Sequence, residues 1–155
     1  MSNYYIFSSY LEHTSGSKFY ETVQINEEGG AAVLIKRHGP ITSKVGGGNF
    51  TPMYSTHQSC TKECMKILSE KRRVRGGGKY EDVTPPSDMR LLNANGRTVN
   101  RQELIDIVNE HYPGKQATAV LSYFALTGQS DQDNRGIVDE RPDEPSERDA
   151  NWGAW

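Results

Sequence analysis

Two apolar runs separated by a glycine turn constrain the fold more than any other feature of this sequence. Residues 19–25 are rich in aromatic and β-branched side chains, the composition of a half-buried strand. Residues 31–35 form a second apolar run of strand length. The motif Glu27-Glu28-Gly29-Gly30 lies between them and supplies glycines, which reach positive φ without steric cost. The pattern predicts an antiparallel hairpin and therefore a sheet with an apolar face to cover.

Further strand signals flank this hairpin. Residues 3–11 carry enough aromatic and branched side chains for a first strand. After Thr42, the glycine-rich stretch 45–49 leads into a short strand expected over residues 50–54. The amino-terminal half of the chain is therefore predicted to be a small antiparallel sheet.

An amphipathic helix is predicted to follow over residues 56–72. Ser55, with Gln58 three residues later, forms a capping-box pattern at its start. Four apolar side chains recur at helical period and form one stripe: Cys60, Cys64, Ile67 and Leu68. Such a helix can close the apolar face of the sheet.

This order of elements resembles the WGR domain, a small nucleic-acid-associated module named for a Trp-Gly-Arg tripeptide. The resemblance begins at residues 9–21, passes through Lys36-Arg37-His38-Gly39-Pro40-Ile41-Thr42 at the family's signature, and ends with the helix. It covers about half of the chain. It implies an α+β fold in which a small antiparallel β-sheet is packed by one α-helix.

Two signature positions depart from the WGR family. His38 stands where the family has Trp, and Pro40 stands where it has Arg, while Gly39 is retained. In the DNA-dependent poly(ADP-ribose) polymerases that carry similar domains, that Trp and Arg serve DNA contact and signalling. Their replacement argues against the same DNA-end role for this chain.

The chain is predicted to divide into four segments. Residues 1–82 form the WGR-like domain. Residues 83–99, with Pro85-Pro86 and few apolar side chains apart from Met89, Leu91 and Leu92, form a linker that packs at one point. Residues 100–128 carry two short apolar stripes and form a helical hairpin too small to hold a core alone, so it is expected to dock on the sheet. Residues 129–155 form an acidic tail, whose composition predicts disorder.

The net charge of −2 hides an uneven distribution. Residues 1–100 carry 13 Lys and Arg against 9 Asp and Glu, whereas residues 101–155 carry 5 against 11. This asymmetry indicates a basic module for an anionic partner, together with an acidic tail.

The cysteines and the hydropathy of the sequence indicate a cellular compartment. The two cysteines lie four residues apart on the predicted helix, so they cannot form a disulfide framework and are typical of a reducing cytosol. The sequence shows no secretory signal and no apolar run long enough to span a bilayer. We therefore expect a cytoplasmic protein with no membrane partner.

Patterns that could carry catalysis or bind a metal are weak. His57, Cys60 and Cys64 lie near one helix face, but a structural zinc site needs a fourth ligand, and both cysteines fall on the apolar stripe. The run Gly76-Gly77-Gly78-Lys79 is followed by Tyr80 and not by the Ser or Thr of a phosphate-binding loop. We therefore predict no catalytic residue, no metal site and no cofactor.

Clustered cations predict a nucleic-acid-binding surface. Five cations fall within residues 71–79, more than helix capping needs, although a solvated helix end is the alternative. Lys and Arg neutralise phosphates without needing exact spacing. The predicted contacts are Lys36, Arg37, His38, Lys71, Arg72, Arg73 and Arg75. For His38, a structural role is the equal alternative.

Two functional hypotheses follow. The first is a non-enzymatic accessory protein that binds nucleic acid, with DNA favoured over RNA. The second is an adaptor or inhibitor of an enzyme of nucleic-acid metabolism, such as a viral or mobile-element factor. It would bind its protein partner through Trp152 and Trp155, the only tryptophans of the chain, at the end of the acidic tail. The tail carboxylates could also fold back on the basic surface at residues 72–75, or the tail could serve solubility alone.

Overall fold

The predicted hairpin lies at the centre of the structure. β2 (Lys18–Glu27) pairs with β3 (Ala31–Pro40) in antiparallel register, with Val23 opposite Ile35. The turn between them places Gly29 and Gly30 at φ values of 112° and 122°, which side chains other than glycine rarely adopt. β2 is buried at every position from 19 to 26, so both faces of the sheet need a cover.

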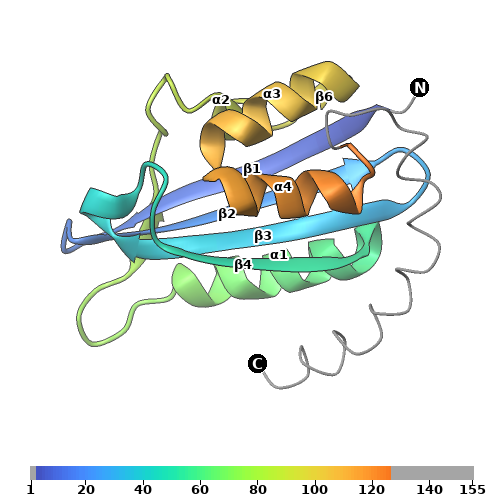
Figure 1. Ribbon diagram of the computed structural model, residues 1–155. Coiled ribbons are helices and arrows are strands. Elements are labelled where there is room, and N and C mark those ends of the chain that lie inside the picture. Colours follow the sequence, from blue (N-terminus) through green and yellow to red (C-terminus); the bar gives the residue numbers. More distant parts are fainter. Residues whose placement is uncertain (1–2, 127–155) are drawn as a thin grey trace.

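The computed structural model describes residues 3–126, where six strands form one antiparallel sheet accompanied by four α-helices (Figure 1). The strand order is β4-β3-β2-β1-β5, and β6 pairs with the other half of β1. The remaining strands are β1 (Tyr4–His13), β4 (Asn49–Thr56), β5 (Tyr80–Asp82) and β6 (Thr98–Val99). The predicted α+β class with an antiparallel sheet is confirmed.

One face of the sheet is covered by α1 (His57–Lys71), as the apolar stripe predicts. Cys60 packs on Ala32 and Leu34 of β3, and Leu68 packs on neighbouring strands. The N-cap is Thr56, whose hydroxyl accepts a hydrogen bond from the Ser59 amide at 3.1 Å. The predicted cap, Ser55, is wrong by one residue, because β4 continues through Ser55 and ends at Thr56, opposite Ala31.

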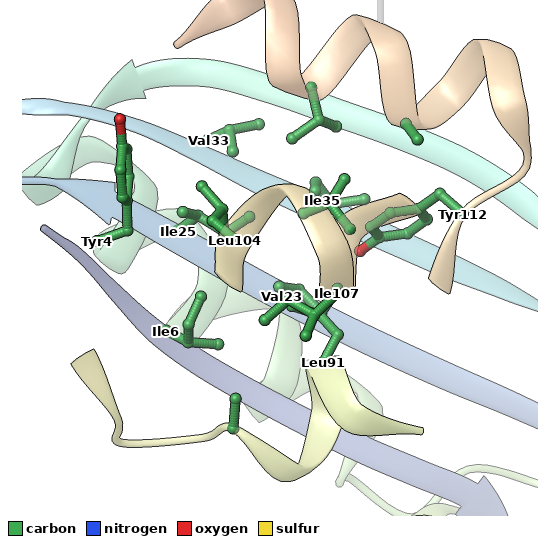
Figure 2. Packing of buried hydrophobic residues seen from close by; sticks show 14 of the residues in the cluster. Tyr4, Ile6, Val23, Ile25, Val33, Ile35, Leu91, Leu104, Ile107 and Tyr112 are labelled. Carbon is green, nitrogen blue, oxygen red and sulfur yellow. The ribbon is translucent and has the colours of Figure 1, made fainter. Parts of the chain in front are cut away.

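The opposite face is covered by three helices: α2 (Arg90–Asn93), α3 (Arg101–His111) and α4 (Gly114–Tyr123) (Figure 1). Leu104 and Ile107 point from α3 toward the sheet, where Val23, Ile25 and Ile35 belong to the same buried cluster (Figure 2). The expected docking of the helical hairpin on the sheet is therefore confirmed for the described residues. A cover of one helix, as the WGR resemblance implies, accounts for one face of the sheet.

Residues 83–99 are not the linker that the sequence predicts. They contain α2 and β6, and Leu91, Leu92 and Val99 are buried in the main core. The reason lies in the outer edge of β1. Without a neighbouring strand its backbone groups would be unpaired, and β6 with the adjoining turn forms hydrogen bonds to them. Residues on both sides of the predicted boundary at 82 consequently share one core.

Two predictions fall at or beyond the limit of the described residues. The acidic tail, residues 129–155, lies outside them, as do the last two residues of the predicted hairpin segment. Within residues 3–126, no helix is long and apolar enough to cross a bilayer.

The two thiols of α1 should differ in reactivity. Cys60 is fully buried, and burial raises the pKa of its thiol to about 11, whereas Cys64 is only partly buried. A thiol reagent at pH 8 should therefore modify Cys64 first and Cys60 only after unfolding, as mass spectrometry of the modified protein can show. Replacing Cys60 by Ala should lower the free energy of unfolding by about 1 kcal/mol. Equal modification rates in the native state would contradict this packing.

Candidate nucleic-acid interface

A cleft of about 610 Å³ forms where the end of α1 meets the turn between β1 and β2. We call it the cationic cleft, because five cations from two chain segments line it: Lys18 from one, and Lys71, Arg73, Arg75 and Lys79 from the other. Glu70 is the one carboxylate among the described residues that line it. The cleft therefore concentrates uncompensated positive charge at one end of the sheet.

Backbone contacts hold the two walls of the cationic cleft together. The Thr14 amide donates to the Lys79 carbonyl at 2.8 Å, and the Lys79 amide donates to the Thr14 hydroxyl at 3.2 Å. Gly78 has a φ of 124°, and a Cβ there would collide with Thr14 Oγ1. Only glycine allows this close approach, so the loop after α1 is fixed against the β1–β2 turn.

An aromatic floor positions Lys71. Its ammonium lies 4.8 Å from the ring centroid of Tyr20 and 5.8 Å from that of Tyr80, within cation–π range. The ring of His38 stacks on Tyr20, with centroids 5.4 Å apart and planes 6° from parallel. Burial, together with the charges of Lys71 and Lys36, holds the pKa of His38 below its ordinary value of 6.5. His38 is therefore mainly neutral at pH 7.

The structure brings some of the predicted contacts together and removes others. Lys71, Arg73 and Arg75 line the cationic cleft, and His38 lies beside it on Tyr20. Lys36, in contrast, lies 3.8 Å from Glu63. Arg72 makes two hydrogen bonds of 2.8 Å to the Asp82 carboxylate and so has a partner of its own.

The prediction that Arg37 contacts nucleic acid is wrong. Its side chain is fully buried and forms an ion pair with Glu21, with 2.7 Å between Nη2 and Oε1. Its guanidinium also donates to the carbonyls of Lys44 and Gly47, each at 2.6 Å. Successive side chains of a strand point to opposite faces, so Arg37 points away from the face that carries Lys36 and His38.

Glu21 connects Arg37 to a third buried side chain, His111 at the end of α3. The imidazole donates from Nε2 to Glu21 Oε2 over 2.8 Å. Burial opposes ionisation of Glu21, but its hydrogen bonds and charge interactions with His111 and Arg37 outweigh burial and keep its pKa below 4.5. This buried network, Glu21–Arg37–His111, is a structural feature separate from the cationic cleft.

The sequence predicted three of the residues that line the cleft, Lys71, Arg73 and Arg75, and missed the others. Lys18, Lys79 and Tyr80 were not among the predicted contacts, nor was the hydrogen-bonded chain of His13 Nδ1, Ser15 Oγ and Ser17 Oγ, with separations of 2.8 and 2.7 Å. Lys79 was visible as the last cation of the basic run. The three-residue strand β5, which carries the loop to the β1–β2 turn, is too short to give a sequence signal.

Comparison with known proteins gave no match to a family model, to a curated protein or to a solved structure. The resemblance to the WGR domain therefore stays a prediction.

The Glu21–Arg37–His111 network should make stability sensitive to acid. Because the pKa of Glu21 is lower in the folded state, its contribution is complete above about pH 4.5 and is lost as the pH falls through the lower folded value. Glu21→Gln should cost about 3–5 kcal/mol at pH 7, since it leaves Arg37 buried without its counter-charge. Urea unfolding at pH 3 to 7 measures both effects.

Glu81→Gln, at an exposed position of β5, is the control for this experiment. It should leave the free energy of unfolding and its dependence on acid nearly unchanged. A Glu21→Gln protein with the stability and the acid dependence of the wild type would contradict the proposed role of the network.

Proposed function

We propose that this protein is a non-enzymatic accessory factor that binds nucleic acid through the phosphates, using the cationic cleft. One observation carries the proposal: five cations from two segments converge on one cleft that has a single carboxylate in its described lining. Phosphate binding needs this clustered charge, because each neutralised phosphate releases condensed counterions. The hydroxyls of Ser15 and Ser17 add neutral hydrogen-bond donors.

The polymer and the compartment are part of the proposal. Four antiparallel strands followed by α1, in the order that the WGR resemblance implies, support a WGR-like fold and favour DNA over RNA. The two free cysteines of α1 support a reducing, cytoplasmic location. The alternative function, an adaptor that binds a protein through Trp152 and Trp155, stays a prediction because these residues lie outside the described range.

Salt dependence tests the binding mode. We expect the affinity for a labelled DNA oligonucleotide, measured by fluorescence anisotropy, to fall steeply with salt and to depend little on sequence. The triple variant Arg73→Gln, Arg75→Gln, Lys79→Gln should lower the slope of log K against log salt by about 0.9 for each phosphate that the variant no longer neutralises.

The matched control removes three exposed cations from elsewhere in the described chain: Lys62→Gln, Lys66→Gln and Lys115→Gln. It has the same net charge as the cleft variant, so local binding in the cleft predicts that only the cleft variant changes the slope. If the wild type does not bind at low salt, or if the slope decreases equally in both variants, the adaptor hypothesis is favoured.

His38 should link this binding to pH. An anion near Lys71 offsets the charges that lower the pKa of His38, so binding should raise that pKa and take up a proton. Affinity should therefore rise as the pH falls through the region of 6.5 and below, and His38→Gln should reduce this rise. Anisotropy titrations at pH 5.5 to 7.5 measure it, with His57→Gln, a histidine outside the cationic cleft, as control. A pH profile unchanged by His38→Gln would exclude the coupling.

A further inference from the structure

Charge complementarity connects the cationic cleft to a segment of the same chain. Residues 127–155 carry eight Asp and Glu against three Arg, a net charge of −5. Residues 1–126 carry 15 Lys and Arg against 12 Asp and Glu, a net charge of +3. Within the described part, the cationic cleft is where this positive excess converges.

The β1–β2 turn and the end of α4 lie at opposite ends of the sheet (Figure 1). The hydroxyl of Tyr123, the last residue of α4, donates to the Ser55 carbonyl at 3.3 Å, and Ser55 lies opposite Ala32, close to the β2–β3 turn. The cleft is formed at the other end, by the β1–β2 turn. Because the strands between these turns have ten residues, the two places are separated by about 30 Å.

This separation decides which carboxylates can reach the cationic cleft. An extended chain advances at most about 3.3–3.6 Å per residue, so roughly nine residues after Leu126 are needed to cover the distance. Asp131 and Asp133, five and seven residues after Leu126, lie short of this backbone distance and are the least able to pair with the cleft cations. The six later carboxylates are within reach: Asp139, Glu140, Asp143, Glu144, Glu147 and Asp149.

We propose that residues 139–149 bind in the cationic cleft of their own chain and compete there with nucleic acid. Carboxylates pair with the Lys and Arg side chains that phosphates would otherwise occupy. Trp152 and Trp155 follow directly, and their indole faces suit contact with the cleft cations. Since the segment is tethered, its effective concentration is in the millimolar range, enough for a weak contact to compete.

The positions of the aromatic residues provide a direct readout in the full chain. All eight tyrosines lie at or before position 123, and both tryptophans lie after position 150. Tryptophan anisotropy therefore reports on the tail alone, and tyrosine-to-tryptophan energy transfer reports its distance from the folded part. Both signals should fall as salt rises from low to high concentration, because salt screens the pairing of opposite charges.

Two pairs of matched variants locate the contact. Arg73→Gln with Arg75→Gln should reduce the anisotropy and the energy transfer at low salt, whereas Lys62→Gln with Lys66→Gln, on the exposed side of α1, should not.

On the tail, Asp143→Asn with Glu144→Gln should reduce both signals and tighten oligonucleotide binding by about three- to tenfold. Asp131→Asn with Asp133→Asn removes the same charge from positions that lie short of the cleft along the backbone, so its effect on both signals and on binding should be much smaller.

The competition rests on the proposed function, but the contact itself does not, and the two can fail separately. The proposed contact would be wrong if the tryptophan signals do not change with salt, or if each variant and its control change them equally. If the signals follow the prediction while no variant binds an oligonucleotide, the contact between tail and cleft stands and the proposed nucleic-acid function fails. Oligonucleotide binding that is equal in both tail variants and the wild type would overturn the competition.

Discussion

The buried carboxylate of Glu21 is the point on which the structure depends most. It holds Arg37 on the neighbouring strand and His111 at the end of α3, so a single side chain joins the sheet to the helical layer above it. Arg37 in turn binds the carbonyls of the loop after β3. A one-residue slip between β2 and β3 would move Arg37 to the face of α1 and separate it from its buried counter-charge, Glu21. The network therefore fixes the register of the central hairpin more strictly than apolar packing alone would.

The cationic cleft shows the opposite arrangement of charge. Its Lys and Arg side chains converge with one described carboxylate between them, and like charges held close together reduce the stability of the folded state. Lys71 gains part of its stabilisation from the rings of Tyr20 and Tyr80. Any anion that occupies the cleft relieves the remaining repulsion, so occupancy and folding stability are coupled. A cluster of this kind is informative because packing of the core does not require it.

Strand-like composition and a glycine turn allowed the sequence to predict the hairpin and the fourth strand, and helical periodicity allowed it to predict α1 and the docked helical hairpin. The pattern does not show which of two alternating cations points inward, and for this reason Arg37 was assigned to the surface. It also does not show that residues 14 and 79 are hydrogen-bonded, since that contact depends on a glycine loop and a three-residue strand. Short elements whose pairing is decided by the remaining free edge of a sheet, such as β6, escape prediction for the same reason.

Residues 83–126 take part in the main core, and this limits which segments of the gene can encode a stable fold. Without β6 and helices α2 to α4, the sheet face that carries Val23, Ile25, Val33 and Ile35 would be open to water, and part of the edge of β1 would have no partner. A gene fragment that ends near residue 82 would encode an aggregation-prone sheet and not a domain that folds on its own. A gene duplication or fusion that preserves the fold must therefore include both the strands and the later helices.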